Sequence, residues 1–189
     1  DNSYPYYVGR NFPVFRGIEI NKRLSEMSNI TPADMMALQT DNYNIVAEMV
    51  RPLLLKNINE NDLNPDEKKY YELLINWDLR NDTGSKGATV FEVYWVTLYK
   101  AIYDDEYAKA PKNTQPPGES AFLEGILNDS AYKFTDVITT DSAETIQEVF
   151  TSAFKKASVQ LKKAEDSKKL EWEKYKGTSI IHLTRLAPF

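Results

Sequence analysis

Residues 87–106, GATVFEVYWVTLYKAIYDDE, carry the most apolar helical pattern of this chain. Their large apolar side chains recur at spacings of three and four residues, which places them on one face of an α-helix. These side chains belong to Val90, Phe91, Tyr94, Trp95, Leu98 and Ile102. Apolar residues cover about half of the circumference, which is typical of a helix buried on most of its sides. The stretch therefore predicts a central helix around which the other elements pack.

Local capping signals predict two helix starts upstream of this stretch. Thr31 and Asn64 each precede a proline at the first helical position, where the missing N–H group costs nothing. Asn64 is also followed three residues later by Glu67, which completes a capping box. These signals predict helices that begin at residues 32 and 65.

Between the two starts, the apolar pattern continues from residue 35 to residue 54 and is interrupted by Thr40-Asp41-Asn42. Asp is a favoured N-cap residue, so we expect Asp41 to restart the helix, giving two helices or one kinked helix. A shorter apolar stripe over residues 18–27 predicts one more helix before them.

The C-terminal half is predicted to contain two helices and at most one strand. Proline-rich residues 110–118 predict a loop, and a short helix is expected over residues 119–127. Asp141, followed by Glu144, predicts the cap of the longest helix, which we expect to reach Tyr175 and to stop at Gly177. β-Branched residues over 178–186 predict a strand.

The pattern as a whole predicts a mainly α-helical fold with at most a short strand near the C-terminus. A single strand has no partner within this chain, so its sheet would have to come from other parts of a longer protein. We therefore expect residues 1–189 to form a single helical domain that is a fragment of a larger chain.

Composition excludes several classes of function. The chain has 23 Lys and Arg against 28 Asp and Glu, and the net charge of −5 argues against binding to nucleic acid or to a membrane surface. The absence of cysteine excludes a thiol nucleophile and a Cys-based zinc site. His182 is the only histidine and no Gly-x-Ser-x-Gly is present, so we interpret His182 as structural. We predict no metal site and no cofactor.

The sequence leaves two features open to more than one interpretation. Clustered aromatic residues are typical of a helical core, but they also occur in grooves that bind sugars or peptides. The clusters consist of Tyr4, Tyr6, Tyr7, Tyr70, Tyr71, Trp77, Tyr94 and Trp95. The lysine-rich residues 155–176 indicate a solvated helix face, with binding of a polyanion as the less favoured reading.

Four stretches in this order resemble the penicillin acylase (penicillin amidase) family of N-terminal nucleophile hydrolases. The first is an aromatic loop followed by an arginine-centred segment, and the second is a "Leu-Gln-x-Asp, then Pro-x-Leu" helical block. The third is a "Leu-x-x-Trp-Asp" block followed by a Ser, Ala, Phe and Trp pattern. The fourth resembles a Trp-Gly-x-x-His segment, from which Tyr175 and Lys176 depart. The stretches are residues 4–7 with 15–20, 30–41 with 51–54, 74–78 with 85–95, and 172–183.

The resemblance implies a hydrolase that cleaves a linear amide bond, releasing an acyl group from an amine, without a cofactor. In this family a precursor with a parent αββα fold cleaves itself, and the serine exposed at the start of the large subunit is the nucleophile. The resemblance places this chain in the helical middle of the large subunit, with no catalytic residue in it. Arg16 matches an arginine that lies beside the substrate pocket, and the resemblance assigns it the support of that pocket.

The resemblance also implies partners and a location. The partners are the small subunit, the rest of the large subunit and a small acyl-amide substrate, in a bacterial protein that is periplasmic or otherwise extracytoplasmic. The acyl group, whether phenylacetyl, glutaryl-like or fatty, stays open. The chain alone is predicted to be inactive. The alternative function is a stand-alone helical module that binds sugars or peptides.

Overall fold

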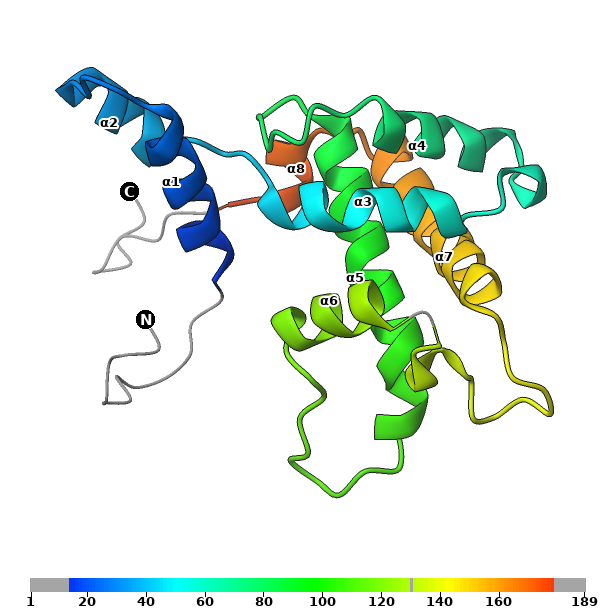
Figure 1. Ribbon diagram of the computed structural model, residues 1–189. Helices are drawn as coiled ribbons and strands as arrows, with labels where there is room; N and C mark the ends of the chain where they lie inside the picture. The colour runs from blue at the N-terminus through cyan, green and yellow to red at the C-terminus, as the bar shows by residue number, and fades with distance from the viewer. Residues whose placement is uncertain (1–13, 130, 179–189) are drawn as a thin grey trace, which may run out of the picture.

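The computed structural model describes residues 14–129 and 131–178. These residues form eight α-helices and two short 3-10 helices, and they contain no β-strand. The mainly α-helical fold is therefore confirmed for the described residues, whereas the strand expected over 178–186 lies outside them apart from Thr178. The helices, shown in Figure 1, are α1 (Phe15–Glu26), α2 (Pro32–Gln39), α3 (Ile45–Asn57), η1 (Glu60–Asp62), α4 (Pro65–Ile75), α5 (Lys86–Tyr107), α6 (Glu119–Asn128), η2 (Lys133–Thr135), α7 (Ile146–Asp166) and α8 (Trp172–Lys176).

Helix α5 is the centre of the bundle, as its apolar pattern predicts. It contacts α4, α7, α8 and η2, and its most extensive contact is with α7. Val90, Tyr94, Leu98 and Ile102, on its inner side, have no exposed surface. Figure 1 shows α5 running through the middle of the molecule, with α3, α4 and α7 around its upper half and α6 beside its lower half.

Aromatic side chains of the helices form much of this core. Tyr70, Tyr71, Trp77, Tyr94 and Trp95 are at most 8% exposed. Edge-to-face contacts such as the one between Tyr94 and the ring of Phe154, with centroids 5.1 Å apart, fix their orientations. The interpretation of these five residues as core is confirmed, and Tyr4, Tyr6 and Tyr7 lie outside the described residues.

Both predicted starts upstream of α5 are confirmed. The side chain of Thr31 accepts a hydrogen bond from the backbone N–H of Asp34, and that of Asn64 accepts one from Glu67. In each case the side chain of the acid accepts a hydrogen bond from the backbone N–H of the cap residue, so both helices begin with a complete capping box.

Two predicted caps are wrong. Helix α3 begins at Ile45 with Asn44 as its N-cap, and Asp41 lies in the connection before it. Helix α7 begins at Ile146 with Thr145 as its cap, not with Asp141. Glu144, the expected box partner of Asp141, instead accepts a hydrogen bond from the backbone N–H of Val137 at 2.8 Å. The carboxylate of Glu144 is therefore bound by residues of the loop before α7.

Helix α7 is also shorter than predicted. It ends at Asp166, and the separate helix α8 covers residues 172–176. With 21 residues it is one residue shorter than α5, which has 22. Gly177 ends α8 with a φ of 58°, a left-handed conformation that glycine adopts without strain, as expected.

Helices α1 and α2 form an arm at one side of the bundle (Figure 1). Helix α1 buries only Phe15 and Glu19 and contacts α3, and α2 buries no residue. In the described ranges, none of the helices combines the length and the hydrophobicity that crossing a bilayer requires.

Candidate functional site

A pocket of about 730 Å³ lies between the arm and the start of α3. Phe15, Ile20, Met35, Met36 and Leu38 form much of its apolar wall. Both methionines are exposed, at 45% and 68%, and methionine adapts its shape to what it contacts. The volume and the largely apolar lining are those of sites that bind small molecules.

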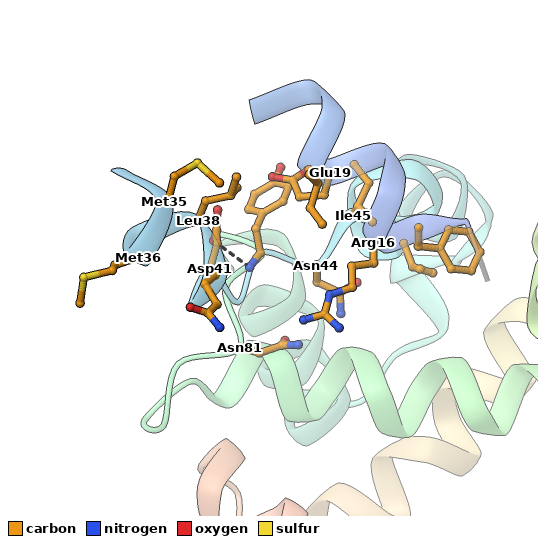
Figure 2. Close-up of a pocket in the computed structure, with 14 residues that line it drawn as sticks. Arg16, Glu19, Met35, Met36, Leu38, Asp41, Asn44, Ile45 and Asn81 are labelled. Carbon is orange, nitrogen blue, oxygen red and sulfur yellow. Dashed lines mark hydrogen bonds between the residues drawn. The ribbon is translucent and has the colours of Figure 1, made fainter. Parts of the chain in front are cut away.

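Arg16 lines this pocket from the first turn of α1. In Figure 2 its guanidinium points toward the side chains of Asn44 and Asn81, which come from the start of α3 and from the loop before α5. The resemblance singled out Arg16, and the structure places it beside a cavity together with these two amides. A guanidinium and two amides can together donate hydrogen bonds to a carbonyl or carboxylate group.

Glu19, one turn after Arg16, is a pocket residue that the sequence patterns did not identify. It is 8% exposed, and its Oε1 accepts a hydrogen bond of 2.7 Å from Nε of Arg23. Its Oε2 is buried and has no hydrogen-bond partner. The available signal was an acid within the apolar stripe of residues 18–27, four residues before an arginine.

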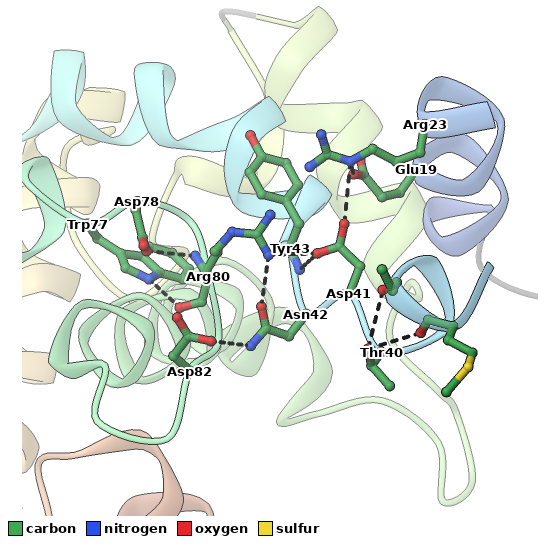
Figure 3. A network of polar contacts seen from close by, with 12 residues as sticks. Glu19, Arg23, Thr40, Asp41, Asn42, Tyr43, Trp77, Asp78, Arg80 and Asp82 are labelled. Atoms are coloured by element: carbon green, nitrogen blue, oxygen red, sulfur yellow. Dashed lines mark hydrogen bonds and ion pairs between the residues drawn. The ribbon is translucent and has the colours of Figure 1, made fainter. Parts of the chain in front are cut away.

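Asp41, at the edge of the pocket, is the centre of a network of charged groups. Its Oδ1 accepts a hydrogen bond of 2.8 Å from Nη1 of Arg80 and one of 3.1 Å from the backbone N–H of Tyr43. Its Oδ2 lies 3.4 Å from Nε of Arg23 (Figure 3). Burial opposes ionisation, but the contacts with Arg80, Tyr43 and Arg23 hold the pKa of Asp41 below its ordinary value.

A short pairing between the backbone of residues 42–44 and that of residues 79–81 brings Arg80 close to Asp41. The N–H of Asn44 donates to the carbonyl of Leu79 at 2.8 Å, and the N–H of Asn81 donates to the carbonyl of Asn42 at 3.1 Å. Leu79 has a φ of 66°, which is rare for a branched residue and which its burial at 7% exposure helps to hold. The turn therefore positions Arg80 opposite Asp41.

Three cationic side chains surround the ring of Tyr43. Lys22, Arg23 and Arg80 lie 5.6, 5.2 and 5.8 Å from the centre of its ring. Glu48 on α3 pairs with Lys22 at 2.8 Å. This ion pair, together with the nearby hydroxyl group of Tyr43, lowers the pKa of Glu48. Burial, then the nearby carboxylate of Glu48, raises the pKa of Tyr43.

The arrangement is suited to binding and orientation of a ligand. The residues that line the pocket are apolar, amide, acidic or guanidinium groups, with the Tyr43 phenol among them. Within residues 14–129 and 131–178, no cluster of three His, Cys, Asp or Glu side chains is arranged to hold a metal ion. His182 lies outside the described residues.

The network connects one of the stretches that carry the family resemblance to a residue that closely follows another. Asp41 closes the Leu38-Gln39-Thr40-Asp41 stretch, and Arg80 follows Trp77-Asp78. The family model for penicillin amidase matches residues 1–188. No curated protein matches the chain. Because the match extends over nearly all of its residues, the chain belongs to the penicillin amidase family.

Proposed function

We propose that this chain is part of an amidohydrolase that cleaves a linear amide bond and releases an acyl group from an amine. The observation that carries the proposal is the match to the penicillin amidase family over residues 1–188, which indicates an amidase-like hydrolase. The reaction then proceeds as N-terminal nucleophile chemistry, with an N-terminal serine as nucleophile and its own α-amino group as base.

Within that enzyme, this chain contributes to the substrate pocket and not to bond cleavage. Arg16 is the residue that we assign to the pocket, because it lines the cavity of about 730 Å³ and its guanidinium points toward Asn44 and Asn81. A planar guanidinium binds carbonyl and carboxylate oxygens through two parallel hydrogen bonds, which orients a substrate as well as attracting it. The nucleophile and the oxyanion donors belong to other parts of the same precursor.

The partners of the chain are accordingly the remaining segments of its own precursor and a small acyl-amide substrate. The family resemblance also supports a periplasmic or otherwise extracytoplasmic location for the parent protein.

The proposal is tested by expressing both the complete reading frame that encodes this chain and the 189 residues alone. Hydrolysis of a chromogenic phenylacetyl amide and of a long-chain acyl amide is measured for both. We expect turnover by the complete product and none by the 189 residues, because removal of a catalytic constellation costs several orders of magnitude in rate.

Arg16→Ala in the complete product is expected to lower kcat/KM, with Asn21→Ala as the matched control. Asn21 is an exposed residue of the same helix and does not line the pocket. Turnover by the 189 residues alone would contradict the placement of the catalytic residues elsewhere. Equal kcat/KM for Arg16→Ala and Asn21→Ala would contradict the role of Arg16.

A further inference from the structure

The attachment of the arm formed by α1 and α2 to the bundle is largely polar. Helix α2 buries no residue, and Phe15 is the one apolar residue that α1 buries. The remaining contacts include ion pairs, such as the one between Lys22 on α1 and Glu48 on α3. An element held in this way opens at a lower free-energy cost than the core, because few apolar contacts have to be broken.

Asp41 connects the arm to the bundle on both sides. It pairs with Arg23 on α1 at 3.4 Å and with Arg80, beyond α4, at 2.8 Å. The side chain of Asp41 is 14% exposed and those of Arg23 and Arg80 are 27% and 39% exposed, so solvent screens these pairs less than it screens pairs on an open surface.

Asp41 carries the negative charge that faces both guanidinium groups beside Tyr43. Lys22, Arg23 and Arg80 surround the ring, and the compensating acids are Glu19, Glu48 and Asp41. Without the charge of Asp41, the guanidinium groups of Arg23 and Arg80 face the same ring without the acid that pairs with both of them. Their mutual repulsion then favours separation of the arm from the turn that carries Arg80.

Arg16 and Arg23 are carried by the same helix, so a movement of α1 moves both side chains. Arg16 lies about two helical turns before Arg23, a spacing that puts both residues on the same side of α1. A rotation or displacement of α1 that breaks the contact between Arg23 and Asp41 therefore moves the guanidinium of Arg16 away from the amides of Asn44 and Asn81, toward which it points in Figure 2.

We propose that Asp41 is a positioning residue. Its ion pairs with Arg23 and Arg80, here called the latch, hold the arm of α1 and α2 against the bundle and thereby direct Arg16 into the pocket. The proposal rests on the function proposed above for Arg16. The effect of the latch on the opening of the arm can be measured without any reference to amide hydrolysis.

The latch is tested by hydrogen exchange in the protein expressed from its complete reading frame. We expect Asp41→Asn and Arg80→Gln each to accelerate exchange over residues 15–39 roughly tenfold, with exchange in α5 and α7 unchanged. Arg80→Lys, which keeps the charge, is expected to restore much of the protection. Asp166→Asn is the matched control, because it breaks an ion pair of 3.3 Å with Lys162 on the face of α7.

Unchanged exchange over residues 15–39 in Asp41→Asn would overturn the latch. Equal acceleration in α5 and α7 would overturn it as well, because the charge would then contribute to the stability of the whole bundle. In the wild-type protein, 1 M salt is expected to accelerate exchange over the same residues, because at that concentration charges are screened beyond about 3 Å.

The positioning role is tested by combining Asp41→Asn with Arg16→Ala and measuring kcat/KM on the two acyl amides. We expect Asp41→Asn to lower kcat/KM in the wild-type background and to have no further effect when Arg16 is already alanine. An equal loss in both backgrounds would overturn the positioning role and leave the proposed function intact. Absence of any turnover would refute the proposed function and the positioning role together, and the exchange data would still decide the latch.

Discussion

Gly87, in the first turn of α5, lies directly against the side chain of Trp77. A methyl group added at Gly87 would stand 2.5 Å from Cγ of Trp77 and 2.9 Å from the carbonyl oxygen of Leu73, closer than real carbon contacts. Helix α5 therefore approaches the end of α4 at a distance that only glycine permits. The centre of the Trp77 ring lies 5.5 Å from the centre of the Phe91 ring, so Trp77 also packs into the core.

Gly87→Ala is expected to destabilise the fold by about 1–3 kcal/mol, because Trp77 and a backbone carbonyl would have to move. Urea denaturation measures the change. Gly84→Ala is the matched control, since a methyl group there meets nothing within 4 Å, and we expect it to stay within about 0.5 kcal/mol of the wild type. Equal midpoints for the two variants would show that the close approach is not present.

Tyr70→Phe is expected to loosen the contact between α4 and α7. The hydroxyl of Tyr70, a fully buried residue, donates a hydrogen bond of 2.9 Å to Oε2 of Glu165, which also pairs with Lys69. Loss of the Tyr70 hydroxyl leaves Oε2 of Glu165 without this partner and should lower the free energy of unfolding by about 1–2 kcal/mol.

Tyr71→Phe is the control for this change. The hydroxyl of Tyr71 makes only a long hydrogen bond of 3.4 Å, to the carbonyl of Leu55, so a smaller loss is expected in the same denaturation experiment. A larger loss for Tyr71→Phe than for Tyr70→Phe would contradict the role of Glu165.

Glu106 should make stability depend on pH between about 4.5 and 7. Burial, then the neighbouring carboxyl group of Asp105, raises the pKa of Glu106 from 4.5 to about 7, and the charge of Asp136 adds to the rise. A raised carboxyl pKa means that the folded state binds the proton more tightly than the unfolded state. The stabilisation is therefore complete below about pH 4.5 and is lost as the pH rises through 7.

The variant Glu106→Gln, which keeps a neutral hydrogen-bonding group, is expected to remove this dependence. Thermal melts at pH 5 and pH 8 should show that the variant gains roughly 2–4 °C over the wild type at pH 8, and little at pH 5. A gain of the same size at both values would show that the charge of Glu106 is not the cause.

Asp41 should titrate at an unusually low pH. Its carboxylate is stabilised, against the effect of burial, by Arg80, Tyr43 and Arg23, so the pKa lies below 3.8. The stabilisation by this group is present above about pH 4 and is lost as the pH falls through the pKa of the folded state. The carboxyl carbon resonance of Asp41 measures the midpoint by NMR, and Arg80→Gln is expected to raise it. A midpoint that Arg80→Gln leaves unchanged would contradict the ion pair.

Much of the helical content could be predicted because its determinants are local. Thr31 and Asn64 cap α2 and α4 with side chains that reach backbone groups only three residues away. The same kind of signal was ambiguous before α7, where Asp141 and Thr145 are each followed three residues later by a glutamate. Thr145 is the cap and Glu148 completes its capping box, whereas Glu144 is bound by the backbone of Val137.

The candidate site depended far more on contacts between distant residues. Arg16 was identified by resemblance to a family, whereas Glu19 and Arg80 were identified only in the structure. Asp41 was expected to cap a helix, yet it pairs with Arg80, 39 residues away in the sequence. Nothing in the neighbourhood of either residue specifies that partner.

The sequence by itself determined where α2, α4 and α5 form and which side of α5 is buried, because capping and apolar periodicity act within a few residues along the chain. Only the tertiary structure decided that the arm of α1 and α2 meets the turn before α5 and encloses a pocket there. That meeting depends on the packing of α3 against α7 and of α4 against α5 and α7, which brings Asp41 and Arg80 to within 2.8 Å.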